Sequence, residues 1–416
     1  MKNSYQIVIV GGGTGGIMTA AQLLKKNSKL KIAIIEPSNN HYYQPAWTLV
    51  GAGTFNFSKT RKDMAEVMPE GVTWVKDKVT SLEPESNSLT TSENGSITYD
   101  YLVLSPGLVY DLDGIEGLRE SLDKGVVCSN YTDPNHTWEV IKNFKGGNAV
   151  FTQPTTPIKC GGAPQKIAYL AADYFRKNKV KNTNVVFATP GSVIFGVPEF
   201  AKTLMKVIFN YGIHFKPFYA PVKIDGENKL VHFKSVAPEN NQCIVNEGNV
   251  LNEKQQGESE IIMPFDMLHL APPQCAPDFI KNSSLVNETK WLEVDINSLQ
   301  HKKHKNIFGL GDVAALPTAK TGAAIRKQAP VVVDNILNLI SKNKIGNEKY
   351  EGYSSCPLVT GYGKMVLAEF KYNNVRDSDP FLSKFVDTTK ENWSMWILKK
   401  YGLPYLYWKK MLKGKM

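Results

Sequence analysis

A glycine-rich segment near the start of the chain constrains the fold more than any other feature. Residues 6–10 form a short apolar run typical of a strand buried on both faces, and Gly11-Gly-Gly-Thr-Gly-Gly16 follows at once. Residues 17–26 then predict a helix, and residues 31–35 a second buried strand that ends at Glu36. A strand, a G-x-G-x-x-G turn, a helix and an acidic residue in this order predict a dinucleotide-binding β-α-β unit.

The same segment predicts which residues hold the dinucleotide. The N-terminus of the helix directs unpaired N–H groups toward phosphates, and the glutamate can accept a hydrogen bond from a ribose hydroxyl. We expect cofactor contacts from the loop and from this glutamate: Gly11, Gly13, Thr14, Gly15, Gly16 and Glu36. A glycine-rich turn without a ligand is the weaker alternative, because it leaves the acidic residue unexplained.

Length and composition are those of a folded protein with more than one domain. The chain has 416 residues, of which 42% are hydrophobic and 21% charged. No segment approaches the ~20 uninterrupted apolar residues of a transmembrane helix. The first predicted strand begins within a few residues of Met1, which leaves no room for a signal or transit peptide. We therefore expect a prokaryotic-style product.

The net charge of +10 is concentrated at the C-terminal end. In residues 384–416, eight lysines stand against Asp387 and Glu391, and three of the seven tryptophans lie among them. Aromatic side chains beside lysines are typical of an interfacial anchor, so we expect peripheral (monotopic) contact with a membrane surface. A C-terminal helix packed on the core is the alternative. No recognition fold accompanies the charge, so nucleic acid is not an expected partner.

The five cysteines do not form a metal-binding pattern. They are Cys128, Cys160, Cys243, Cys275 and Cys356. No two have C-x-x-C spacing and no His/Cys cluster accompanies them, so we expect no metal. A lone cysteine is usually a small buried hydrophobic residue, which is the expectation for Cys243 and Cys275.

A second β-α-β pattern begins near Leu112. Its predicted elements are strands at residues 147–153 and 184–189 and helices at residues 163–177 and 199–211. Between the first strand and its helix, residues 154–162 contain two prolines and Cys160 in place of dinucleotide glycines. This unit therefore resembles a nicotinamide-binding domain that has lost its cofactor.

Further segments return the chain to the first unit. Residues 88–98 predict a hairpin with an Asn-Gly turn, and residues 97–107 a buried strand that ends in a Pro-Gly turn at Gly107. Residues 261–270 predict one strand. Residues 306–312 end in Gly311-Asp312, where a carboxylate can meet a ribityl hydroxyl. With the N-terminal fingerprint, Gly107 and Asp312 favour FAD over NAD.

The predicted fold class is α/β, with two Rossmann-like (FAD/NAD(P)-type) domains and a C-terminal amphipathic membrane-associating segment. Residues 1–111 and 290–350 form a discontinuous FAD-binding Rossmann domain. Residues 112–289 are predicted to form a second Rossmann-like domain; the family resemblance described next implies that this domain carries a catalytic cysteine. Residues 351–416 are predicted to form a membrane-anchoring region, in which the same resemblance implies a quinone site.

Several long blocks resemble the sulfide:quinone oxidoreductases, in particular the mitochondrial-type branch of this family in the disulfide-reductase-like flavoprotein superfamily. The resemblance runs nearly end to end. It rests on residues 40–53, 156–167, 311–312, 316–321 and 353–362.

The resemblance implies a redox-active pair, Cys160 and Cys356, joined as a disulfide or bridged by sulfane sulfur. Two structural buried cysteines are the alternative. Hydrosulfide would attack the pair, because thiol–disulfide exchange proceeds by attack on a disulfide sulfur. The resemblance implies that Cys356 carries the persulfide and that Cys160 reacts with the flavin. It also places Lys320 near the flavin pyrimidine edge and implies FAD contacts from Gln44 and Val79.

Other roles are less closely defined. Cys128 matches a cysteine that some bacterial members use in catalysis or flavin attachment, and we expect it to be accessory. His136 and Glu199 are candidate general bases. The resemblance places the quinone among aromatic residues after Cys356, which indicates Phe370, Tyr405 and Tyr407.

The predicted function is oxidation of hydrogen sulfide to persulfide or polysulfide through a cysteine pair and FAD, with two electrons passed to a membrane quinone. Glutathione, sulfite, cyanide and a growing polysulfide are all chemically able to accept the sulfur. A homo-oligomer is a further expectation. One alternative is a type II NADH:quinone oxidoreductase, which would need glycines after residue 153. A non-catalytic persulfide-carrying flavoprotein is another.

Overall fold

The glycine-rich segment joins a strand to a helix in the computed structural model, which describes residues 3–238 and 249–416. β1 (Ser4–Val10) leads through the glycines into α1 (Thr14–Lys26), and β2 (Ile32–Ile35) follows. A Cβ atom at Gly16 would overlap the carbonyl oxygen of Gly11, so the helix can start this close to the strand only with glycine there. The predicted β-α-β unit is confirmed, with a helix that begins three residues earlier than expected.

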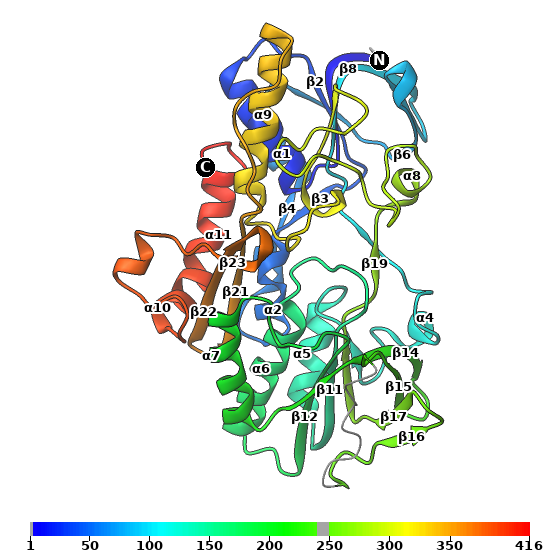
Figure 1. Ribbon diagram of the computed structural model, residues 1–416, viewed down its shortest axis with the longest axis vertical. Helices are drawn as coiled ribbons and strands as arrows, with labels where there is room; N and C mark the ends of the chain where they lie inside the picture. Colours follow the sequence, from blue (N-terminus) through cyan, green and yellow to red (C-terminus); the bar gives the residue numbers. More distant parts are fainter. Residues whose placement is uncertain (1–2, 239–248) are drawn as a thin grey trace.

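A mixed sheet is built around β1, and Figure 1 labels β2, β6 and β8 of this sheet. Its strand order is β5-β2-β1-β8-β7-β6, with β20 also beside β8. Val10 pairs with Ile35 and Leu104, and Leu104 pairs with Gly309, all in parallel register. The carboxyl ends of these strands therefore meet at one edge. The added strands are β5 (Val72–Val75), β6 (Val79–Glu83), β7 (Ser88–Thr91), β8 (Gly95–Leu104) and β20 (Ile307–Gly309).

A second sheet is parallel throughout, in the order β10-β18-β11-β12-β13. Its strands are β10 (Val127–Cys128), β11 (Gly147–Thr152), β12 (Thr183–Thr189), β13 (His214–Pro217) and β18 (Met267–Leu270). An antiparallel sheet lies beside it, in the order β14-β15-β17-β16. Those strands are β14 (Tyr219–Asp225), β15 (Leu230–Ser235), β16 (Lys254–Gln256) and β17 (Glu260–Pro264).

The single strand predicted at residues 261–270 is wrong. β17 and β18 belong to different sheets, and the chain changes sheet between them at Asp266. The carboxylate of Asp266 accepts a hydrogen bond of 2.8 Å from the backbone N–H of Asn148, at the start of β11. This hydrogen bond fixes the chain between β17 and β18, so the apolar residues of the segment 261–270 do not form one continuous strand.

Helices cover the sheets. The longer ones are α5 (Pro134–Asn143), α6 (Ala163–Lys177), α7 (Pro198–Tyr211) and α9 (Ile325–Lys342), and α9 packs beside α1. Short helices are α2 (Trp47–Val50), α3 (Met64–Val67), α4 (Leu118–Ser121) and α8 (Asp278–Lys281). Two small pairs complete the fold: β3 (Asn40–Tyr42) with β4 (Arg61–Asp63), and β9 (Val109–Tyr110) with β19 (Gln274–Cys275).

The C-terminal region packs across both sheet systems (Figure 1). A hairpin of β21 (Ser354–Gly361) and β22 (Lys364–Lys371), extended by β23 (Val375–Arg376), lies against α6. The final helix consists of α10 (Trp393–Ile397), η8 (Leu398–Gly402), α11 (Leu403–Leu406) and η9 (Tyr407–Met411). Among the described residues, no helix combines the length and the apolar character needed to cross a bilayer.

Candidate active site

The fingerprint residues meet at the carboxyl edge of the first sheet. Glu36 follows β2, and its carboxylate accepts hydrogen bonds from the backbone N–H groups of Gly12 (2.7 Å) and Ser38 (2.8 Å). Nothing lies within 4 Å of a Cβ atom built at Gly13, so the loop has an open side there. An open glycine loop at a helix N-terminus, beside an oriented carboxylate, fits a dinucleotide.

Lys320 lies at the Gly-Asp turn of the same edge. Its Nζ donates to the carbonyl oxygens of Asp312 (2.7 Å) and Ala314 (2.9 Å), and it lies 4.0 Å from the ring centroid of Trp291. Burial lowers the pKa of Lys320 to about 8 and raises the pKa of Asp312. The ammonium group is therefore fixed beside the residues predicted to meet the flavin.

The backbone of Lys320 also holds Cys160. The Cys160 N–H donates to the Lys320 carbonyl oxygen (2.7 Å), and Tyr131 donates its hydroxyl to the carbonyl oxygen of Cys160 (3.2 Å). Cys160 has a φ of +50°, a left-handed conformation that is uncommon for a residue other than glycine. These contacts join the cysteine loop of the second sheet to the edge of the first.

The structure brings Cys160 and Cys356 together. Cys356 is on β21, is 1% exposed and receives a hydrogen bond from the backbone N–H of Gly162. A Cβ atom at Gly162 would lie 2.5 Å from Leu358 Cδ2, so this glycine allows α6 to approach β21 closely. Both cysteines carry free thiols in the structure and hydrogen-bond to each other.

The two thiols have opposite acidities. The hydrogen bond from Cys356, together with the charge of Lys166, holds the pKa of Cys160 well below its usual range although burial opposes the shift. The hydrogen bond to Cys160, together with burial, raises the pKa of Cys356 well above its usual range. The preferred state of the pair is a Cys160 thiolate that accepts a hydrogen bond from a Cys356 thiol.

Lys166 is a site residue that the sequence analysis missed. Its Nζ lies 3.0 Å from the Cys160 sulfur, and the side chain is 2% exposed. Burial favours the neutral amine, but the neighbouring cysteines outweigh it and raise the pKa of Lys166, so the cation persists. One signal was present: Lys166 is in the first turn of α6, where long side chains point back toward the helix N-terminus.

A second buried lysine reaches the site from the C-terminal helix. Lys399 is 3% exposed and donates to the carbonyl oxygen of Pro45 (2.7 Å). Burial and repulsion by Lys166 lower the pKa of Lys399 to about 7, against the attraction of the two cysteines. It is therefore a cation that can lose its proton near neutral pH.

Cys356 also lines a cavity of about 400 Å³. This cavity lies at the carboxyl ends of β11 and β12, where Gln153 and Thr189 line it, and Gln165, Phe195 and Phe370 form other parts of its wall. A small molecule can therefore reach the Cys356 side of the thiol pair from the second sheet.

Other predicted residues take varied positions. Gln44 is exposed and accepts from Lys159 Nζ (2.7 Å) next to Cys160, whereas Val79 is buried in the core beneath the first sheet. Gly107 has a φ of +76° in its predicted turn.

The remaining cysteines differ in burial. Cys128 is fully buried in the same core as Cys356, and burial raises the pKa of Cys128. Cys275 is partly exposed, and Cys243 lies outside the described residues.

The three aromatic residues suggested for quinone are not brought together. Phe370 lines the Cys356 cavity, Tyr405 is 59% exposed on the last helix, and Tyr407 is buried against the glycine loop. Phe370 and Tyr407 belong to different hydrophobic cores. They do not outline a common quinone site.

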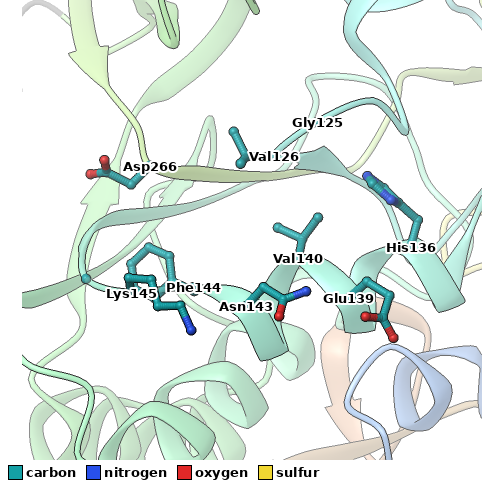
Figure 2. A pocket seen from close by; sticks show the side chains of 10 residues that line it. Gly125, Val126, His136, Glu139, Val140, Asn143, Phe144, Lys145 and Asp266 are labelled. Carbon is teal, nitrogen blue, oxygen red and sulfur yellow. The ribbon is translucent and has the colours of Figure 1, made fainter.

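The candidate general bases are not in the cysteine cavity. His136 lines a separate cavity of about 360 Å³ between α5 and the segment at Val126, where the charged ends of Glu139, Lys145 and Asp266 diverge (Figure 2). Glu199 is exposed at the start of α7. Within the described ranges, no three His, Cys, Asp or Glu side chains are arranged to hold a metal ion.

Comparison with known proteins decides the family. The model of the pyridine nucleotide-disulphide oxidoreductases matches residues 5–334. The mitochondrial sulfide:quinone oxidoreductases of Mus musculus and Dictyostelium discoideum are 39% and 43% identical, over 99% and 100% of this chain and 87% of each relative. The chain belongs to the sulfide:quinone oxidoreductase family. The crystal structure of the Aquifex aeolicus family member has the same fold, with a TM-score of 0.77 at 20% identity over 99% of this chain and 92% of that one.

The comparisons also bear on two other expectations. A type II NADH:quinone oxidoreductase of Staphylococcus aureus is 27% identical over only 29% of this chain, so the main interpretation is favoured over this alternative. The relatives above are named as mitochondrial proteins, which runs against the expectation of a prokaryotic-style product.

Proposed function

We propose that this protein oxidises sulfide at Cys160 and Cys356 and passes two electrons through FAD to a quinone. The assignment of roles rests on the different surroundings of the two thiols. Lys166 Nζ lies 3.0 Å from the Cys160 sulfur, whereas Cys356 lines a cavity. A cation beside one sulfur and a cavity beside the other give the two cysteines different chemical roles.

The first step is attack of hydrosulfide on the Cys160–Cys356 disulfide. The new S–S bond forms at the Cys356 sulfur, the bond between the cysteines breaks, and Cys160 leaves as a thiolate. The products are a persulfide on Cys356 and a Cys160 anion, so the charge of HS⁻ is conserved. The sulfur with the lower pKa leaves faster, and Lys166 stabilises its charge.

The edge of the first sheet would hold the flavin. The glycine loop would accept the pyrophosphate, Glu36 a ribose hydroxyl and Asp312 the ribityl chain. Bound flavin supplies the two-electron acceptor that oxidises the thiols and reduces the quinone. Lys320 would place its positive charge where negative charge accumulates in the reduced cofactor.

The sulfane sulfur would leave through the Cys356 cavity. A nucleophilic acceptor attacks the outer sulfur of the persulfide and releases the Cys356 thiolate. Glutathione, sulfite, cyanide and a growing polysulfide all have this chemistry, and the cavity of about 400 Å³ has room for the smaller of them without rearrangement.

The last helix would rest on a membrane surface. Trp393, Tyr401 and Tyr405 are spaced by four or eight residues and are 69%, 60% and 59% exposed. Lys409 and Lys410 are exposed at its end. Exposed aromatic residues followed by lysines suit the interface of an anionic bilayer, from which a quinone can be supplied.

An anaerobic titration of the yellow protein tests the proposed function. Sulfide is expected to bleach the flavin absorption, and NADH is expected to leave it unchanged. Cys160→Ser and Cys356→Ser should abolish the response to sulfide while retaining flavin. Reduction by NADH without a response to sulfide would overturn the proposal.

A further inference from the structure

A buried chain of hydrogen bonds connects the last helix to the glycine loop. The hydroxyl of Tyr407 lies 2.8 Å from Thr14 Oγ1 and 2.6 Å from His41 Nε2. The other ring nitrogen of His41, Nδ1, lies 2.9 Å from the carbonyl oxygen of Gly12. Tyr407 is 5% exposed and His41 is 3% exposed, so water does not compete for these bonds. Thr14 directly and Gly12 through His41 are thus hydrogen-bonded to Tyr407, which lies near the C-terminal end of the sequence.

The direction of each hydrogen bond follows from the chemistry of its partners. The Gly12 carbonyl can only accept, so Nδ1 of His41 carries the proton. Burial lowers the pKa of His41 to about 4, so the ring is neutral at physiological pH and Nε2 accepts. Tyr407 therefore donates to His41, and Thr14 donates to Tyr407. This arrangement fixes the Thr14 side chain at the first residue of α1.

Packing reinforces the connection. The ring of Tyr407 lies 4.6 Å from that of Tyr43 and 5.0 Å from that of Trp408, centroid to centroid. Further along α1, the side-chain amide of Gln22 donates to the carbonyl oxygen of Met416 (2.8 Å). The C-terminal residues thus hold α1 at its start and in its third turn, so its N-terminus cannot move independently of them.

We propose that the last helix retains the dinucleotide cofactor, with Tyr407 as the positioning residue that acts through Thr14 and Gly12. The same C-terminal helix also carries the exposed aromatic residues Trp393, Tyr401 and Tyr405. Membrane contact that orders this helix therefore tightens cofactor binding, and by thermodynamic reciprocity the bound cofactor strengthens membrane contact. The inference rests on the proposed flavin site and goes beyond it.

The first test removes one hydroxyl from the full-length holoprotein. Tyr407→Phe keeps the ring and its packing but leaves Thr14 and His41 without their partner. FAD binding to each flavin-stripped variant, followed by flavin fluorescence, is expected to weaken about tenfold. Tyr405→Phe removes an exposed hydroxyl from the same helix and should change the affinity less than about twofold.

An affinity of Tyr407→Phe within about twofold of wild type would overturn the positioning role. Thermal unfolding of the flavin-stripped proteins provides a second measurement. If Tyr407→Phe acted only on general stability, its affinity would return to the wild-type value at a temperature well below its unfolding transition, and this outcome would also overturn the role. Failure of the proposed flavin site itself is distinguishable, because the wild type and Tyr405→Phe would then bind no FAD.

The second test measures the linkage to lipid. Holoprotein would be bound to vesicles of equal parts phosphatidylcholine and phosphatidylglycerol, and flavin release into a chaotropic salt would be followed with and without vesicles. Slower release from vesicle-bound wild type, with a smaller effect in Tyr407→Phe, is expected. Equal release rates for vesicle-bound and free wild type, or failure to sediment with vesicles, would overturn the membrane part of the proposal.

Discussion

Two strand-to-helix junctions of the molecule share one architecture but differ in the length and composition of their loops. After β1, residues 11–13 form a short glycine turn that leaves the N-terminus of α1 open. After β11, residues 153–162 form a longer loop that places Cys160 at the N-terminus of α6, with Lys166 in the first turn. Helix N-termini favour negative charge, which under the proposed function is a cofactor phosphate at the first junction and the Cys160 thiolate at the second. The longer loop of the second junction therefore presents a cysteine where the first junction presents glycines.

The largest effect is expected at the first junction. Gly16→Val would force a side chain into the Gly11 carbonyl oxygen and separate α1 from β1, so the purified protein should be colourless and destabilised. Gly13→Ala is the matched control, because a Cβ atom there meets no protein atom within 4 Å. It should leave the thermal stability of the flavin-free protein unchanged but weaken FAD binding. Normal flavin content in Gly16→Val would show that flavin binding at the first junction does not require the close approach of α1 to β1.

The thiol pair formed by Cys160 at the second junction and Cys356 on β21 is tested by removing each sulfur in turn. Cys160→Ser and Cys356→Ser should each lower sulfide-dependent quinone reduction by at least about a thousandfold, since neither can form the disulfide that sulfide attacks. Flavin content, measured by absorption, should stay normal because neither residue belongs to the first junction. Cys275→Ser is the control and should retain activity. Substantial turnover by either site variant would contradict the thiol mechanism.

Replacing the cation beside Cys160 should have an intermediate effect. Lys166→Met preserves much of the buried volume but removes the charge that stabilises the Cys160 thiolate as it leaves. The rate of sulfide-dependent flavin reduction in stopped flow should fall about tenfold to a hundredfold. Lys202→Met, an exposed change on α7, should leave that rate unaltered. An equal rate in both variants would show that the second junction does not depend on its lysine.

The smallest effect is a shift in the pH dependence of alkylation. The hydrogen bond from Cys356 and the charge of Lys166 favour the thiolate, so Cys160 of the reduced protein should react with iodoacetamide at a pH below the ordinary midpoint of about 8.5. Lys166→Met should move this midpoint upward by about one to two units. Peptide mass spectrometry would separate Cys160 from the less acidic Cys356. A midpoint at or above 8.5 in the wild type would contradict the assigned acidities.

The sequence predicted the first junction because its signals are local. Buried strands, the glycine spacing and Glu36 lie within one short segment, and the hairpin at residues 88–98 has an Asn-Gly turn. The prediction of one strand at residues 261–270 was wrong because the chain changes sheet at Asp266, whose carboxylate is held by the backbone N–H of Asn148, although the apolar pattern is nearly continuous. The order of apolar and polar residues in a sequence does not show which polar side chain makes a hydrogen bond of this kind.

The second junction was only partly predictable. The resemblance indicated Cys160 and Cys356, but a lysine on a helix ordinarily indicates a surface position. Lys166 is buried in the structure, where α6 packs against β21 and neighbouring elements. The contact between Tyr407 and Thr14 joins residues at opposite ends of the chain. Such contacts depend on tertiary packing and leave no local pattern.

The position of the persulfide tests the division of roles most directly. Oxidised protein would be mixed anaerobically with sulfide and quenched into an alkylating reagent before flavin reduction is complete, then digested for mass spectrometry. The thiol mechanism predicts one extra sulfur on the peptide that contains Cys356 and an alkylated thiol at Cys160. An extra sulfur on the Cys160 peptide, or on neither, would contradict it.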